Sequence, residues 1–114
     1  MKKLISILLS AMMLICCASF AAADAADFDA DLVAAAKEEG TLIVYGSCEE
    51  EYLAAACEKF ESMFGIKVQY QRLSTGEVQA KIEEEAGNPS ADVWFGGTTD
   101  PYNVCAAEGL LEAY

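Results

Sequence analysis

An apolar run that opens onto a short polar loop stands at residues 42–49, Leu42-Ile43-Val44-Tyr45-Gly46-Ser47-Cys48-Glu49. The apolar part is rich in β-branched and aromatic residues, which favours a β-strand. The segment after the loop repeats its apolar residues at helical spacing, as the inward face of a helix does: Leu53, Ala56, Cys57, Phe60 and Phe64. The stretch therefore predicts a strand, a loop and a helix in that order.

The same unit recurs twice further along the chain. Ile66–Leu73 is a strand-like run followed by the loop Ser74-Thr75-Gly76-Glu77, and Ala91–Phe95 is followed by Gly96-Gly97-Thr98-Thr99-Asp100. A helical pattern follows each loop, and another precedes the first strand at Asp29–Glu39. Repeated strand–helix units predict an α/β fold that begins a doubly wound, parallel three-stranded sheet. The third run is short and mostly apolar, which is typical of a central parallel strand.

All three loops are expected to leave the sheet at one edge. Parallel strands end at the same side, and open α/β sheets bind ligands beyond these carboxyl ends. Small hydroxyl residues and glycines that open onto helix N-termini suit an anionic or hydroxyl-rich small molecule. The candidate ligand-binding residues are Ser47, Ser74, Thr75, Gly76, Gly97 and Thr98, with Arg72 as a candidate phosphate clamp.

Each candidate also has a purely structural interpretation. Ser47 has the residue type of an ordinary helix cap, and Ser74 with Glu77 matches a capping box. Thr98 lies in a helix-entry turn that Thr99 or Asp100 is expected to cap. An arginine such as Arg72 more often pairs with a surface acid. Capping leaves other first-turn N–H groups free, so the two interpretations are compatible.

Several aromatic and thiol side chains are expected to be structural. Trp94 and Tyr45 precede the edge of the sheet, so core packing is favoured over a stacking platform for a ligand. Cys57 and Cys105 occupy apolar helix positions and are expected to be buried free thiols. Cys48 is expected to be a loop thiol without a catalytic role, because the acids that follow it oppose thiolate formation.

Residues 1–23 have the pattern of a cleaved secretory signal peptide. Two lysines precede an apolar run, and three alanines stand before Asp24, where cleavage is expected. The cysteine pair in the run is a poor lipoprotein site, because Cys16 occupies the position before Cys17 that requires a small residue. Residues 24–114 then form one small domain at most.

Charge and residue types exclude several kinds of function. The formal net charge of the whole chain is −12. Residues 1–23 contain two lysines and no acid, so the net charge of residues 24–114 is −14. Such a surface repels phosphate backbones, so no nucleic-acid partner is expected. The chain has no histidine, so neither a zinc-histidine site nor a Ser-His-Asp triad can be built from it. We expect no enzyme activity, no metal site and no cofactor.

The chain resembles the N-terminal lobe of bacterial ABC-transporter solute-binding proteins of the iron(III), phosphonate and hexose-phosphate type. The resemblance lies in segments spread over about residues 30–114: Leu32–Gly40, Leu42–Ser47, Phe60–Val68, Arg72–Glu77, Ala86–Val93, Gly96-Gly97 and Glu108–Glu112. It implies the first lobe of a two-lobed type II periplasmic-binding-protein fold. It also implies a solute held between lobes and delivered to a membrane permease, in the periplasm, by a protein expected to be monomeric.

The resemblance leaves the solute open. Iron-binding members carry a histidine or acid in the first loop and a glutamate after the third strand, where this chain has Glu49 and Gly97. The hydroxyl-rich loops look more like members that bind phosphorylated or phosphonate-bearing solutes, which are favoured. The hinge and second lobe are expected to be absent from residues 24–114, so a truncated nonfunctional product is an alternative, and a secreted α/β enzyme is a weaker one.

Overall fold

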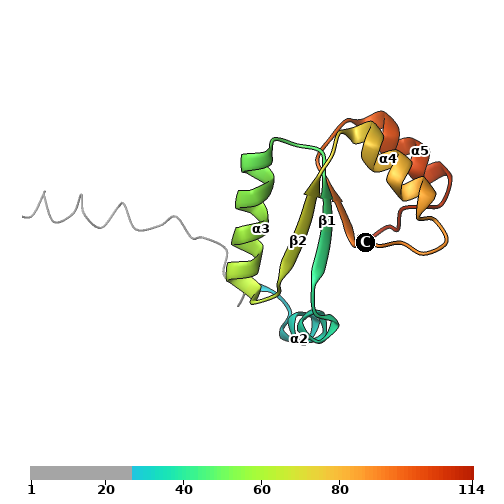
Figure 1. Cartoon of the computed structure of the whole chain (residues 1–114). Coiled ribbons are helices and arrows are strands. Elements are labelled where there is room, and N and C mark those ends of the chain that lie inside the picture. Colours follow the sequence, from blue (N-terminus) through green and yellow to red (C-terminus); the bar gives the residue numbers. More distant parts are fainter. Residues whose placement is uncertain (1–26) are drawn as a thin grey trace, which may run out of the picture.

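The computed structural model describes residues 27–114 of the chain (Figure 1). The predicted signal peptide and its cleavage point lie outside the described residues. The elements follow in the order α2 (Ala30–Glu39), β1 (Leu42–Gly46), α3 (Glu50–Phe64), β2 (Val68–Arg72), α4 (Thr75–Glu84), β3 (Val93–Phe95) and α5 (Thr99–Ala107). The three predicted strand–loop–helix units are all present.

The strands form one parallel sheet in the order β2-β1-β3. The last residue of β1, Gly46, is paired with Arg72 at the end of β2 and with Phe95 at the end of β3. The three carboxyl ends are therefore level, at the upper edge of the sheet in Figure 1. This order corrects one expectation: within the described residues the central strand is β1, and the apolar β3 lies at an edge.

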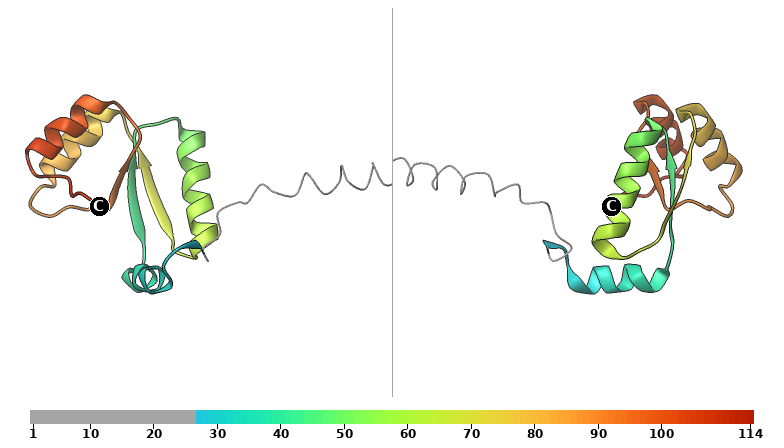
Figure 2. Two further views of the ribbon diagram at one scale, coloured as in Figure 1. Left: turned by 180° about the vertical axis from the view of Figure 1, so that it is seen from behind. Right: turned by 60° about the vertical axis from the view of Figure 1, so that its left-hand side comes forward.

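Helices cover both faces of the sheet. Figures 1 and 2 show α3 on one side, and α4 and α5 together on the other. Val44 faces α3 and forms a buried cluster with Leu53 and Cys57 of that helix. The next residue, Tyr45, is also buried and points to the opposite side, as alternation along a strand requires. Helices on both faces confirm the doubly wound arrangement.

Several element boundaries differ from the predicted ones, and β2 at Val68–Arg72 is shorter than the predicted run of residues 66–73. β3 begins at Val93 and not at Ala91. Asp92, just before it, is bonded to Ile43 of β1 twice: the Asp92 carboxylate accepts the Ile43 N–H at 2.8 Å, and the Asp92 backbone N–H is donated to the Ile43 carbonyl. α4 ends at Glu84, with Glu85 as its C-cap. Bonds between distant segments, such as those of Asp92 with Ile43, are not visible in local periodicity.

α2 lies at the amino ends of the strands, away from the three loops (Figure 1). Its N-cap, Asp29, accepts the N–H groups of Asp31 and Leu32 at 2.9 and 3.0 Å. Phe28 makes an edge contact with Phe64 of α3, with ring centroids 5.2 Å apart. Within residues 27–114, no helix combines the length and apolar character that crossing a membrane requires.

Candidate ligand-binding site

The loop after β1 is fixed to the end of β3 at Ser47. The Ser47 N–H is donated to the Phe95 carbonyl at 2.9 Å, which extends the strand pairing by one residue. The Ser47 side chain is held as well, because the indole Nε1–H of Trp94 is donated to Ser47 Oγ at 3.1 Å. Backbone and hydroxyl are therefore both positioned at the carboxyl edge, and the predicted capping role for Ser47 is wrong, since Glu49 is the N-cap of α3.

The other two loops converge on the same point. A β-carbon on Gly97 would lie 2.8 Å from Thr75 Oγ1 and 3.1 Å from the β-carbon of Ser47. The Thr98 N–H is donated to Thr75 Oγ1 at 3.4 Å. Gly97 has φ +108°, a conformation that L side chains rarely adopt. The structure thus gathers four sequence-predicted residues, one or two from each loop.

Two of the helices that open here have no side-chain cap. The N-caps of α3 and α5 are Glu49 and Thr98, and neither side chain bonds a first-turn N–H group. The expectation that Thr99 or Asp100 caps α5 is therefore wrong. First-turn N–H groups without an internal partner make a helix N-terminus favourable for an anion.

α4 is different, because it has a side-chain cap made by its own residues. Ser74 Oγ accepts the Glu77 N–H at 3.4 Å, and Glu77 Oε2 accepts the Ser74 N–H at 2.8 Å, which confirms the capping box. These bonds with Ser74, helped by nearby Arg72, lower the pKa of Glu77. Gly76 lies in the same turn, with open space where a β-carbon would be.

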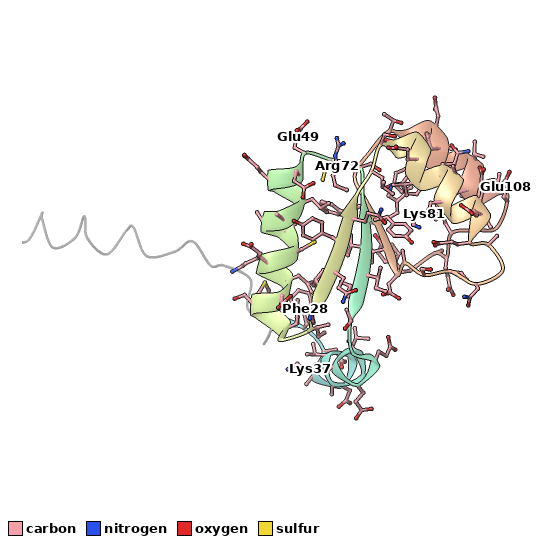
Figure 3. All side chains as sticks on the ribbon, viewed as in Figure 1. Phe28, Lys37, Glu49, Arg72, Lys81 and Glu108 are labelled. Carbon is pink, nitrogen blue, oxygen red and sulfur yellow. The ribbon has the colours of Figure 1, made fainter. Side chains whose placement is uncertain are left out.

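Arg72 stands at the end of β2, exposed at the carboxyl edge of the sheet together with Glu49 (Figure 3). Its Nε–H is donated to the Cys48 carbonyl at 3.1 Å. This bond ties β2 to the first loop and leaves the terminal guanidinium nitrogens at the edge. The arrangement differs from the simple surface ion pair that the sequence suggested.

Tyr102 belongs to the support of this site, and sequence reasoning missed it. Its ring stacks on Trp94 with centroids 3.9 Å apart, and its hydroxyl donates to the Gly96 carbonyl at 2.6 Å. Burial, with a smaller effect of Cys48, raises the pKa of Tyr102 and keeps the donor protonated. The signal in the sequence that could have indicated this contact is the position of Tyr102, one turn into the helix that follows the Trp94 strand.

One hollow of the described residues lies away from the three loops. A shallow hollow is lined by Glu58, Glu61, Ser62, Gly65 and Lys67, at the far end of α3 from the three loops. Between residues 27 and 114, no three histidine, cysteine or acidic side chains come together as a metal site would require. The carboxyl edge is a hydrogen-bonding surface made of hydroxyls, backbone N–H groups and one arginine.

Comparisons with known proteins find one similar sequence and three similar structures. No family profile matches the chain. An uncharacterised protein of Haemophilus influenzae is 39% identical over 79 residues, which cover 69% of this chain and 23% of that protein. Three solved structures of periplasmic binding proteins are also similar.

The periplasmic binding protein AfuA of Actinobacillus pleuropneumoniae, solved with fructose-6-phosphate bound, is 42% identical with a TM-score of 0.64, over 67% of this chain and 24% of that one. The periplasmic binding protein P5PA is 36% identical with a TM-score of 0.65, over 66% and 24%. Iron-bound HitA of Pseudomonas aeruginosa is 26% identical with a TM-score of 0.59, over 61% and 23%.

These similarities identify the chain as a match to part of a type II periplasmic binding protein, in the subgroup that includes hexose-phosphate and iron receptors, and so confirm the resemblance seen in the sequence. The chain spans about a quarter of the length of these proteins. The activity, solute and partners of a whole receptor are therefore matters of proposal.

Proposed function

We propose that the chain serves in a solute-binding receptor of an ABC import system, and that the solute is a small anion of the sugar-phosphate class. The observation that supports this is the convergence of Ser47, Thr75, Gly97 and Thr98 from three loops at the carboxyl edge. Hydroxyls, uncapped helix N-termini and an arginine together suit phosphate oxygens. The similarity to a fructose-6-phosphate-bound protein favours the same class.

The acidic surface is compatible with such a site. The net charge of −12 opposes approach of an anion at long range, but helix N-termini act within about a turn. We propose that residues 1–23 direct export, that residues 24–114 belong to the first lobe, and that the receptor acts in the periplasm as a monomer with a membrane permease. Binding without turnover is the expected behaviour.

Calorimetric titration of the full chain tests the proposal. Fructose-6-phosphate is the main probe, and fructose, inorganic phosphate and iron(III) are the comparison probes. We expect saturable binding of the sugar phosphate and much weaker binding of fructose. Binding of iron(III) alone would favour the iron-receptor alternative, and binding of none of the four would refute the proposal.

A pair of serine variants locates the site. Ser47→Ala removes a hydroxyl at the carboxyl edge, and a hydrogen bond to a charged group contributes about 1.5–3 kcal/mol, so affinity should fall about tenfold or more. Ser62→Ala is the matched control, since Ser62 is exposed near the far end of α3. Equal affinities of the two variants would place the solute elsewhere.

A further inference from the structure

The hydrogen bond between Trp94 and Ser47 fixes the role that the serine hydroxyl can play. An indole N–H is a donor only, so Ser47 Oγ must accept from it, at 3.1 Å. The hydroxyl hydrogen then has to point away from Trp94. Within residues 27–114, Ser47 Oγ takes part in this hydrogen bond alone. Its O–H is therefore left to donate to another group at the carboxyl edge.

Trp94 is itself held by Tyr102 of α5. Tyr102 of α5 stacks on the indole with an interplanar angle of 17° and centroids 3.9 Å apart. The Tyr102 hydroxyl anchors this ring to the Gly96 carbonyl at 2.6 Å, directly beside the Gly97 loop. Both rings are only partly exposed. The indole consequently has one orientation, and the geometry of its N–H bond to Ser47 is set before any solute arrives.

We propose that Trp94 is a positioning residue that holds Ser47 as a hydrogen-bond donor and so selects solutes presenting an anionic acceptor oxygen. Tyr102 supports it through stacking. The selection of solutes rests on the proposed function, which supplies the identity of the solute. The orientation of Ser47 by Trp94 concerns the ligand-free protein and does not depend on it. A hydroxyl fixed as a donor favours phosphate oxygens over sugar hydroxyls, because a hydrogen bond to a charged acceptor is stronger than one to a neutral hydroxyl.

The ligand-free half is tested by nuclear magnetic resonance. Trp94 is the only tryptophan of the chain, so the spectrum of the ¹⁵N-labelled full chain contains a single indole N–H signal. We expect Ser47→Ala to shift this signal and to speed its exchange with solvent. Ser62→Ala is the control and should leave the signal in place. An indole signal unmoved by Ser47→Ala would overturn the inference, whether or not a solute is known.

The selectivity half is tested by comparing probes. Trp94→Phe keeps a ring that stacks on Tyr102 but removes the N–H donor. Because one net hydrogen bond corresponds to about a tenfold change at most, we expect the preference for fructose-6-phosphate over fructose to fall about three- to tenfold. Tyr70→Phe, on the exposed β2 strand, is the control and should keep the preference.

The outcomes separate the two proposals. Equal losses for both probes in Trp94→Phe would mean general damage and would overturn the selectivity role. If the unmodified chain binds none of the probes, the proposed function fails, and the indole signal alone then decides whether Trp94 orients Ser47. Tyr102→Phe adds a check, since loss of its bond to Gly96 should broaden or shift the same signal.

Discussion

The hydroxyl of Tyr45 donates to the carboxylate of Glu85, with both carboxylate oxygens 3.0 Å away. Tyr45 lies in the central strand, and Glu85 is the C-cap of α4. Lys81 completes the cluster with a 3.0 Å ion pair to Glu85 and a position 5.2 Å from the centre of the Tyr45 ring. The cluster anchors the last turn of α4 to the sheet. The first turn of the same helix supplies Thr75 to the site.

Glu85→Gln should weaken the dependence of stability on acid pH. Lys81 above all, and then Tyr45, lower the pKa of Glu85 in the folded chain. A lowered folded pKa gives stability that is present above the ordinary glutamate pKa and lost as pH falls through the folded value. Urea denaturation between neutral pH and about pH 3 measures this. The exposed neighbour Glu84→Gln is the control, and identical pH profiles for both variants would contradict the expectation.

Gly97→Ala should destabilise the fold and disturb the site together. The added methyl group meets Thr75 Oγ1 at 2.8 Å and Cγ2 at 2.9 Å, at a residue with φ +108°. A residue held in such a sparsely populated conformation costs about 1–3 kcal/mol. Thermal denaturation should show the loss. Gly87→Ala, which meets nothing within 4 Å, is the control, and a similar loss there would show that contact at the carboxyl edge is not the cause.

The order of elements could be predicted from the sequence because each unit has its own local pattern. The apolar run at residues 42–46 and the helical spacing from Leu53 to Phe64 are both local signals, and both are confirmed. The central position of β1 was not predicted, since strand order depends on contacts between distant segments. The shortened β3 has the same origin: Asp92 bonds the backbone of Ile43, 49 residues away.

The candidate site was predictable in part for a related reason. Parallel strands bring their carboxyl ends together, so the meeting of Ser47, Thr75 and Gly97 followed from topology. The roles within the site did not follow. Trp94 was expected to be a core residue, and nothing local indicates that its indole reaches Ser47 or that Tyr102 stacks on it.

Ser74→Ala should remove the capping box of α4. Loss of a serine N-cap costs about 1 kcal/mol, and the Glu77 carboxylate loses the partner that contributes most to its lowered pKa. We therefore expect a lower unfolding midpoint and a Glu77 pKa closer to its ordinary value, measured by a nuclear magnetic resonance titration. Ser62→Ala is the control. An unchanged Glu77 titration would mean that the Ser74 hydroxyl does not lower the pKa of Glu77, and that the backbone N–H of residue 74 and Arg72 do.

Leu53→Ala should be the most destabilising of these changes. The Leu53 side chain has no exposed surface, and it fills the space that a β-carbon on Gly46 would need. Removing a buried leucine costs about 2–5 kcal/mol, since a cavity remains. Leu32→Ala, on α2 where 67% of the leucine is exposed, is the matched control and should stay within about 0.5 kcal/mol. Chemical denaturation of both variants compares them directly, and similar losses would mean that the cluster around Val44 does not hold α3 to the sheet.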